Sequence, residues 1–266
     1  MNNLTDTELQ EYLNNHPLKE LHTIKLHADD MYYNQGKPSG FDDWQYDMLK
    51  ETLDRRDPDY VVPVGVKIRN GSNRVDLPFW LGSMDKFKNG DVKEIKRWSA
   101  RNRSSKYIIE DKLDGVSCLL THHNGKIKLY TRGDGIVGAD ISYLAQYFKT
   151  VPKDLTEDIR VRGELIMNKK VFKKKYTKRY ANPRNLVAGM TGAKTVKKGI
   201  RDIQFIAYEI VGSGKMPKPS QQLAHLNSIG FTAVRHRIIE TLEVDTLMST
   251  LVDFVETSPY EIDGLI

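Results

Sequence analysis

Apolar residues recur at helical spacing through the first sixty residues of the chain. Three segments carry this pattern, and Pro17 and the Gly-Lys-Pro-Ser-Gly turn at residues 36–40 separate them. The predicted helices span residues 4–12, 18–33 and 41–56. Asp57-Pro58 closes the third helix, so this part of the chain is predicted to be a small helical module.

The pattern becomes strand-like from Lys106 onward, and Asn124-Gly125 is a strong signal for a hairpin turn. Strands are predicted at residues 107–110, 116–121, 126–132, 159–167 and 205–211. Helices are predicted at residues 92–100, 140–148, 220–229 and 245–256, and residues 61–84 are predicted to be extended and turn-rich. The fold class is therefore α+β, with a helical module (1–65) before an antiparallel-sheet domain (66–266).

Composition narrows the class of protein. The chain is 39% hydrophobic and 29% charged, and no apolar run approaches the roughly 18 to 20 residues that span a bilayer. The N-terminus is polar and lacks the apolar core of a secretory signal. The single cysteine, Cys118, excludes an internal disulfide framework and a cysteine-rich zinc site. We expect a soluble cytoplasmic protein without a membrane partner.

The charge of the chain leaves two interpretations open. Its formal net charge is +6, and much of the excess lies in residues 169–180, which read KKVFKKKYTKRY. Cations interleaved with aromatic residues suit the phosphate backbone of a nucleic acid. A solvated helix face has the same composition, so charge permits nucleic acid binding without establishing it.

Short motifs follow one another along the predicted strands. The first is Glu110-Asp-Lys-Leu-Asp-Gly115, in which a lysine between strands precedes an aspartate and a glycine; alone, it is typical of a surface lysine before a turn. Further motifs follow it in order. They are Thr131-Arg-Gly-Asp-Gly135, Arg162-Gly-Glu164, Asn182-Pro-Arg-Asn185 with Ala188-Gly189, Phe205-Ile-Ala-Tyr208 and Glu261-Ile-Asp-Gly-Leu-Ile266.

This order and spacing resembles the nucleotidyltransferase motifs of polynucleotide ligases and capping enzymes. The TRGDG and NPRNLVAG segments are similar specifically to NAD⁺-dependent DNA ligases, and the resemblance covers essentially the whole chain. It implies a nucleotidyltransferase (adenylylation) domain that uses NAD⁺ and Mg²⁺. It also implies a function in DNA replication and repair, with nicked double-stranded DNA as the partner.

The resemblance implies that Lys112 attacks the α-phosphate of NAD⁺, forms lysyl-AMP and releases nicotinamide mononucleotide (NMN). The AMP would later pass to a DNA 5′-phosphate at a nick. Lysine can be such a nucleophile where cations or desolvation depress its pKa. Asp114 and Asp263 would organise the catalytic site and its metal, whose ligands the sequence does not identify.

The remaining motif residues would bind the AMP half of NAD⁺. By the resemblance, Glu110 would accept a hydrogen bond from the adenine N6, and Tyr208 would flank the adenine base. Arg132 and Glu164 would hold the ribose, and Arg184 would bind the phosphate. Ser83 would lie in a loop on the adenosine side. Ordinary structural interpretations stay open as well. They are an ion pair between Glu164 and Arg162, turn formation by Asp134 and core packing by Tyr208.

One face of the predicted helix 41–56 carries two carboxylates and a phenol, opposite an apolar stripe. The polar face holds Asp43, Tyr46 and Asp47, and the stripe holds Phe41, Trp44 and Met48. With Tyr33, this face is similar to the NMN-recognition module of the same ligases, and its carboxylates suit a cationic nicotinamide ring. The alternative is an ordinary amphipathic helix with a solvated acidic face.

Two positions depart from the family pattern. Asn34 stands where the family has a histidine, and Gly192 stands where a second phosphate-contacting arginine is expected. Lys194, Lys197 or Lys198 would supply the charge of that arginine but not its bidentate geometry.

The chain stops at Ile266, inside the last predicted strand, before the further lysine motifs and DNA-gripping modules of the family. We therefore expect a truncated ligase or one half of a split gene, with a separate C-terminal half as partner and otherwise a monomer. Two alternatives stay open. One is a catalytically dead NAD⁺- or DNA-binding remnant, and the other is an ATP-dependent RNA ligase or capping-type nucleotidyltransferase, against which the predicted NMN-binding set argues.

Overall fold

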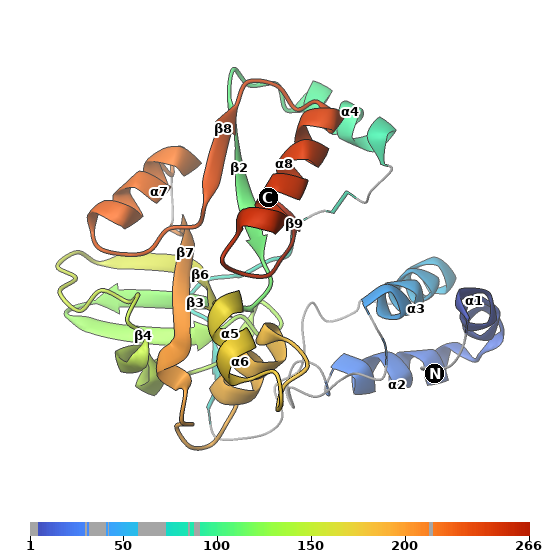
Figure 1. Ribbon diagram of the computed structural model, residues 1–266, viewed down its shortest axis with the longest axis horizontal. Coiled ribbons are helices and arrows are strands. Elements are labelled where there is room, and N and C mark those ends of the chain that lie inside the picture. Colours follow the sequence, from blue (N-terminus) through green and yellow to red (C-terminus); the bar gives the residue numbers. More distant parts are fainter. Residues whose placement is uncertain are drawn as a thin grey trace.

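The computed structural model describes residues 5–29, 31, 41, 43–57, 73–84, 86–87, 91–212 and 215–266, without the side chains of Asp43, Trp44 and Asp47. Three helices at the N-terminal end group together, apart from the strands (Figure 1). The predicted boundary at residues 65/66 lies outside the described residues and stays a prediction. In the described part, no helix is both long enough and apolar enough to cross a membrane.

The N-terminal group consists of α1 (Asp6–Asn15), α2 (Leu18–Asp29) and α3 (Asp43–Arg56), which confirms the three predicted helices. A capping box starts α1, because the Thr5 side chain accepts from the backbone of Glu8 while the Glu8 carboxylate accepts from the backbone of Thr5. The helices bury a small leucine-rich core of their own. Its buried members are Leu9, Leu13, Leu21, Met48, Leu49 and Leu53, with Phe41 packed against it.

The larger sheet is antiparallel, with strand order β4-β3-β6-β7. Its strands are β3 (Val116–His123), β4 (Lys126–Thr131), β6 (Ile159–Met167) and β7 (Ile203–Ile210), close to the predicted ranges. Asn124 and Gly125 both adopt positive φ angles, of 50° and 73°, at the predicted β3–β4 hairpin turn. This sheet is the part of the fold that sequence patterning describes best.

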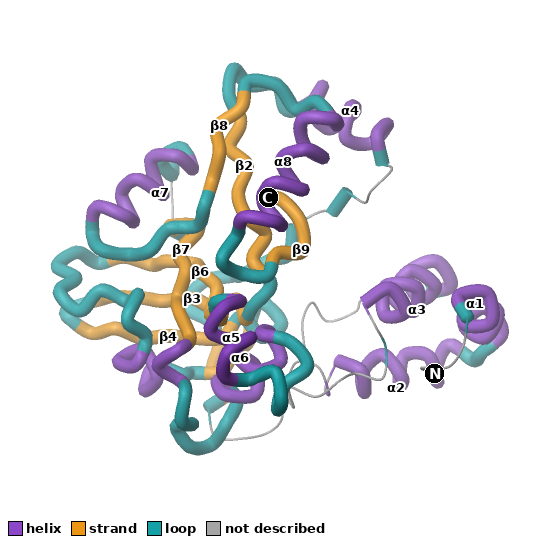
Figure 2. Tube along the Cα trace, viewed as in Figure 1, coloured by secondary structure: helices purple, strands orange, loops and turns teal. Residues whose placement is uncertain are grey.

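Helices cover one face of the larger sheet and bury most of the core (Figure 2). They are the 3₁₀ helix η2 (Ser142–Tyr147), α5 (Lys169–Lys175), α6 (Pro183–Thr191), the 3₁₀ helix η3 (Ile200–Asp202) and α7 (Pro219–Ser228). The other face carries Ser117 and Glu164, which lie directly opposite each other in the β3–β6 register. Side chains of directly opposite residues share a face, so the polar motif residues of β3 and β6 lie together.

A smaller sheet has the order β8-β2-β9. It contains β2 (Tyr107–Leu113), β8 (His236–Ile239) and β9 (Ile262–Leu265), and α8 (Val244–Thr257) packs beside β9. Only Asp114 and Gly115 separate β2 from β3, so β2 leads from the smaller sheet straight into the larger one (Figure 1). The two sheets therefore meet at the end of β2.

The structure corrects several expectations. Lys112 lies within β2 and not between strands, because pairing of Lys112 with Gly264 of β9 extends the strand beyond its locally predicted end. The predicted helix 140–148 is the shorter 3₁₀ helix η2. Helix α6, strand β8 and the two-stranded sheet of β1 (Arg74–Asp76) with β5 (Val137–Ala139) were not predicted. Helix α4 (Val92–Arg101) agrees with the prediction.

Candidate active site

The expected nucleophile faces a carboxylate from the end of the chain. The Nζ atom of Lys112 donates to both carboxylate oxygens of Asp263, each at 2.5 Å. The two side chains are 31% and 45% exposed, so the pair is open to a ligand. The β2–β9 pairing brings them together, and the structure thus unites two of the three expected catalytic residues.

The third expected catalytic residue, Asp114, lies in the turn after β2. Its Oδ1 atom accepts from Nη1 of Arg184 at 2.6 Å. Arg184 is the second residue of α6, which begins where the Asn182 side chain accepts from the backbone of Asn185 at 2.7 Å. The Asn-Pro-Arg-Asn motif is therefore a helix start that presents its arginine to the turn next to Lys112.

The glycine of the same turn allows close packing against β6. A Cβ atom on Gly115 would lie 2.4 Å from the backbone oxygen of Leu165 and 2.9 Å from Cγ of Glu164. A side chain at this position would force the turn away from the strand. Gly115 thus brings the lysine motif into contact with the Arg-Gly-Glu motif.

Glu164 is buried on β6, with 7% of its surface exposed. Burial, with a smaller contribution from the nearby carboxylate of Asp114, raises the pKa of its carboxyl to about 8, although Arg184 and Arg132 oppose the shift. The ion pair considered for Glu164 and Arg162 is wrong, because Arg162 pairs with Glu209 at 3.0 Å. At neutral pH the Glu164 carboxyl is therefore largely protonated, so beside the two cations it can donate a hydrogen bond to a ligand as well as accept one.

Glu110 precedes Lys112 by two residues on β2, so the two side chains lie on the same face of the strand. Glu110 is buried, and burial together with the charge of Glu209 raises the pKa of its carboxyl to about 7. A carboxyl of this kind can switch between accepting and donating hydrogen bonds near neutral pH. Glu209 belongs to no motif recognised in the sequence, because its relevance arises only from the pairing of β6 with β7.

An irregularity in the β6–β7 register allows two consecutive residues of β7, Tyr208 and Glu209, to interact with residues of the site. The register shifts between Arg162 and Gly163, opposite Glu209 and Ala207 respectively. The hydroxyl groups of Tyr208 and Ser117 lie 2.8 Å apart, and burial raises the pKa of Tyr208. Tyr208 also packs against the core, so its ligand role and its structural role are compatible.

The Thr-Arg-Gly-Asp-Gly motif forms a tight turn after β4. The backbone N–H of Arg132 donates to Ser117 at 2.8 Å, and the Asp134 side chain accepts from the backbone of Ile136 and of Val137. The turn-forming role of Asp134 is thus confirmed. Gly135 has a φ of 92°, in the left-handed region that glycine enters without strain.

Ser83 is exposed in the segment that leads up to α4. This segment is held near the turn, because the backbone N–H of Leu81 donates to Gly135 at 2.9 Å. Nη2 of Arg162 also donates to the backbone oxygen of Gly82 at 3.3 Å. Ser83 is therefore placed beside Arg162, which sequence reasoning did not assign to the site.

The expected NMN-recognition residues are described only in part. Tyr33 lies outside the described residues, and Asp43 and Asp47 are described only as backbone within α3. The Tyr46 hydroxyl donates to Asp29 Oδ1, whose second oxygen accepts from Lys25 Nζ at 2.8 Å. Tyr46 is thus held by a buried ion pair of α2, and its role toward NMN stays a prediction.

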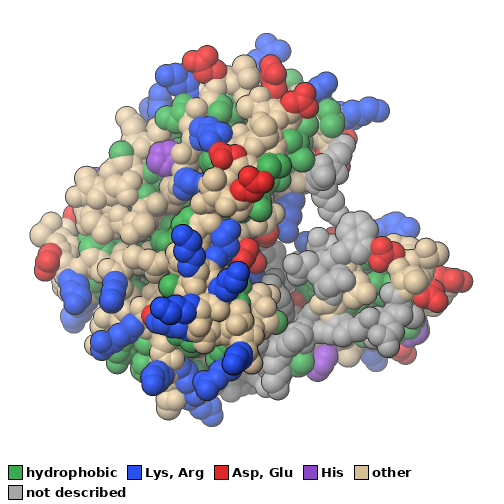
Figure 3. Space-filling model, in the orientation of Figure 1, with side chains coloured by type: hydrophobic (Ala, Val, Ile, Leu, Met, Phe, Trp, Pro, Cys, Tyr) green, Lys and Arg blue, Asp and Glu red, His purple; other side chains and the backbone are tan. Residues whose placement is uncertain are grey.

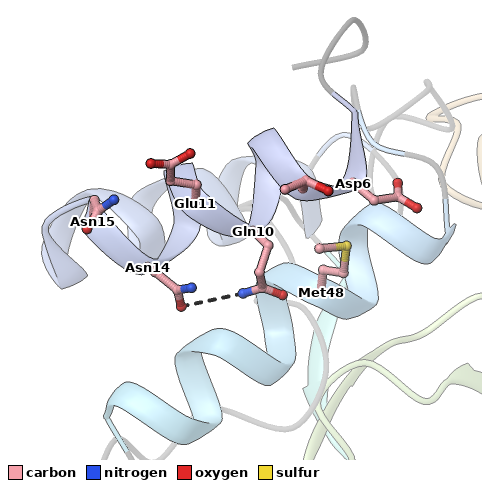
Figure 4. Close-up of a pocket in the computed structure, with 7 residues that line it drawn as sticks. Asp6, Gln10, Glu11, Asn14, Asn15 and Met48 are labelled. Carbon is pink, nitrogen blue, oxygen red and sulfur yellow. Dashed lines mark hydrogen bonds between the residues drawn. The ribbon is translucent and has the colours of Figure 1, made fainter.

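A pocket lies between α1 and α3 (Figure 4). Its lining residues are polar except for one methionine, and Gln10 donates to Asn14, one turn further along α1, at 3.4 Å. Asp6, Thr7, Gln10, Glu11, Asn14, Asn15 and Met48 form the lining. None of these residues belongs to the predicted nucleotide site, and we assign the pocket no role in it.

Basic side chains gather over α5 and the segments around it (Figure 3). Residues 169–201 contain many lysines and arginines and no aspartate or glutamate. Phe172 anchors α5 in the core, whereas Lys173, Lys174 and Lys178 are exposed. The predicted basic segment is thus a surface that presents positive charge to solvent.

Two antiparallel sheets that meet at a strand-borne lysine, with buried carboxylates and arginines around it, define a nucleotidyltransferase-type site. The match to known families agrees with this class. The chain belongs to the NAD-dependent DNA ligase adenylation domain family, which matches residues 78–266.

Viral and bacterial proteins share the similarity over most of this chain. A DNA ligase of Acanthamoeba polyphaga mimivirus is 39% identical over 247 residues, which are 91% of this chain and 38% of that protein. A putative DNA ligase of Invertebrate iridescent virus 6 is 34% identical over 91% of this chain and 39% of its own length. A DNA ligase of Treponema pallidum is 29% identical over 94% of this chain and 32% of that protein. The chain thus spans about two fifths or less of these relatives.

Proposed function

We propose that this chain carries out the adenylylation step of an NAD⁺-dependent DNA ligase. Nζ of Lys112 attacks the α-phosphorus of NAD⁺, an N–P bond forms, and the P–O bond to NMN breaks. NMN leaves with the electron pair of the broken bond, AMP stays on Lys112, and the protons that the lysine nitrogen loses pass to the Asp263 carboxylate and to solvent. The contact between Lys112 and Asp263 carries the proposal, because it holds an exposed amine at one defined place in the site.

The surrounding residues fit the AMP half of NAD⁺. Arg184 and Arg132 supply positive charge beside Glu164, which suits phosphate and ribose groups. Glu110 lies on the Lys112 face of β2 and suits the adenine amino group as an acceptor. The guanidinium of Arg162 lies 5.8 Å from the centre of the Tyr208 ring and donates to the backbone oxygen of Gly82, next to Ser83, and both Tyr208 and Ser83 would face the adenosine. These roles agree with those that the family resemblance implies.

The donor set is compatible with Mg²⁺. This ion commonly uses one or two carboxylates together with phosphates of the substrate and water. Asp114 and Asp263 would supply such oxygens, and among the described residues no group of three or more potential ligands is preassembled. A bound Mg²⁺ supplies charge neutralisation at the phosphates. The side chains of Lys112, Arg132 and Arg184 would neutralise the same phosphate charge.

Two further parts of the chain fit the rest of the reaction. The face of α3 with Asp43, Tyr46 and Asp47 would recognise NMN and favour NAD⁺ over ATP, which offers pyrophosphate in its place. The basic surface around α5 would contact the phosphate backbone of nicked DNA, the acceptor of the stored AMP.

The decisive experiment is incubation of the chain with NAD⁺ and Mg²⁺ followed by intact mass measurement. We expect the mass of one AMP to be added, and no addition to the Lys112→Ala variant. Parallel incubation with ATP should leave the mass unchanged. Lys126→Ala changes an exposed lysine of β4 and should label as fast as the unmodified chain.

The outcomes separate the alternatives. Labelling of Lys112→Ala would assign the nucleophile elsewhere. Labelling by ATP at the rate seen with NAD⁺ would contradict the proposed NMN selectivity. A folded chain that never becomes labelled would be a binding remnant and not an enzyme.

A further inference from the structure

Asp111 lies between Glu110 and Lys112, yet its side chain turns away from them. Side chains alternate along a strand, so Asp111 occupies the opposite face of β2. Its side chain is 1% exposed, which is unusual for a carboxylate. Burial of a charge is costly unless it is paired and hydrogen-bonded.

Both oxygens of Asp111 have partners. Oδ1 accepts from Nε and Nη2 of Arg235 at 3.0 and 2.7 Å, and Oδ2 accepts from the Ser258 hydroxyl at 2.9 Å. The backbone N–H of Asp111 also donates to the backbone oxygen of Arg235 at 3.1 Å. The carboxylate is thus fully compensated by groups from far along the chain.

Arg235 extends this cluster to the end of α8. Its Nη1 donates to Thr257 Oγ1 at 2.6 Å, its Nη2 donates to the Phe254 backbone oxygen at 2.7 Å, and its guanidinium lies 3.9 Å from the centre of the Phe254 ring. Thr257 is the last residue of α8, and Ser258 is its C-cap. The cluster therefore fixes the point from which the chain turns into β9.

Strand β9 carries Asp263, five residues after Ser258. The cluster is thus anchored at one end next to Lys112 and at the other end just before the carboxylate that Lys112 contacts. Buried ion pairs seldom stabilise a protein more than well-packed apolar residues would, whereas their contacts are directional. Directional contacts of this kind are needed to keep the Lys112 amine and the Asp263 carboxylate within hydrogen-bonding distance.

We infer that Asp111 and Arg235 are positioning residues, which hold β2 and the start of β9 so that Lys112 and Asp263 meet. The inference rests on the proposed adenylylation and adds a specific requirement to it. The side chains of the cluster form their hydrogen bonds with one another and with the end of α8, not with the residues expected to bind the nucleotide. Its loss should therefore slow AMP transfer at saturating NAD⁺ and leave the KM for NAD⁺ nearly unchanged.

The test uses Asp111→Asn, Arg235→Lys and the milder Ser258→Ala. Transfer of AMP to Lys112 is followed by intact mass in single turnover, over a range of NAD⁺ concentrations. We expect the saturated rate to fall roughly 10- to 100-fold for the first two variants, the scale of a misplacement of about 1 Å. Ser258→Ala should lose less, because Arg235 still holds the other oxygen.

Arg237→Gln is the matched control. Arg237 is two residues after Arg235 and pairs with Asp253 at 2.6 Å, so it links β8 to α8 without contacting Asp111. Its variant should transfer AMP at the unmodified rate. Circular dichroism at the assay temperature identifies folded variants, and if Asp111→Asn does not fold, Arg235→Lys and Ser258→Ala decide.

The unmodified rate in folded variants of the cluster would overturn the inference and leave the proposed function intact. A raised KM with an unchanged saturated rate would overturn it as well, since it would indicate a role in binding. Failure of the unmodified chain to label Lys112 would overturn both proposals. Slow transfer at an unchanged KM, with the control unaffected, supports positioning.

Discussion

Lys112 and Asp263 are 151 residues apart in the chain, and the lysine Nζ lies 2.5 Å from the aspartate carboxylate. The contact depends on the antiparallel pairing of β2 with β9, which places Lys112 opposite Gly264. The residue expected to become adenylylated is therefore oriented by a strand that comes from the other end of the domain.

Replacement of Asp263 by asparagine should slow adenylylation. The amine would lose its charged partner and one of two acceptor oxygens, so we expect the single-turnover rate to fall about 10²-fold, the usual effect of removing one well-placed group. Intact mass against time measures the rate. Asp253→Asn, at an exposed carboxylate of α8, is the control, and an equal loss there would indicate a general effect of charge.

Stability should fall as pH rises across the neutral range. Burial raises the pKa of Glu110 to about 7 and that of Glu164 to about 8, so between about pH 4.5 and 8 the folded state holds more protons than the unfolded state. The free energy of unfolding therefore decreases through this window, by about 1.4 kcal/mol per unit of pKa shift. Urea titrations at pH 5 and pH 8 measure it.

Glu164→Gln isolates the contribution of one carboxyl to this pH dependence. The amide mimics the protonated acid, so the variant should lose less stability than the unmodified chain between pH 5 and pH 8. Glu256→Gln changes an exposed carboxylate and should leave the pH dependence as it was. Parallel curves for Glu164→Gln and the unmodified chain would contradict the assignment.

Tyr46→Ala should impair the reaction with NAD⁺ before AMP is transferred and not afterwards. Tyr46 is expected to contact only the departing NMN, so its loss should slow lysyl-AMP formation while a chain that already carries AMP keeps it. NAD⁺-dependent labelling and the stability of the purified lysyl-AMP form are measured together. Lys50→Ala, on the same helix, should behave as the unmodified chain; unchanged labelling of a folded Tyr46→Ala would remove the case for NMN recognition.

Binding to nicked duplex DNA should depend on the lysines around α5. Combined replacement of Lys173, Lys174 and Lys178 by alanine should weaken binding at low salt. It should also reduce the slope of log affinity against log salt by about 0.9 for each DNA phosphate that the variant no longer neutralises. Fluorescence anisotropy with a labelled nicked duplex measures both quantities. The same replacement of Lys126, Lys128 and Lys153 controls for net charge, and an equal effect there would show that α5 is not a specific contact surface.

Local chemistry determined much of this fold from the sequence. Helical spacing of apolar residues marked α1, α3, α4 and α8, and Asn124-Gly125 marked a hairpin, because these features depend on neighbours within about four residues. Strand β8 gave little local signal, since His236–Ile239 is short and mostly exposed and becomes a strand only by pairing with β2. Helix α6 was missed because a segment that contains both proline and glycine has low helical propensity.

The residues of the candidate site were likewise predictable from the sequence only in part. The order and spacing of the motifs pointed to Lys112, Glu164 and Arg184 through their resemblance to NAD⁺-dependent DNA ligases. Only the tertiary structure decided that Lys112 meets Asp263, that Arg162 pairs with Glu209, and that Asp111 is buried against Arg235. Such contacts depend on strand register and on burial. Both arise from packing between segments far apart in the chain, which periodicity within one segment does not encode.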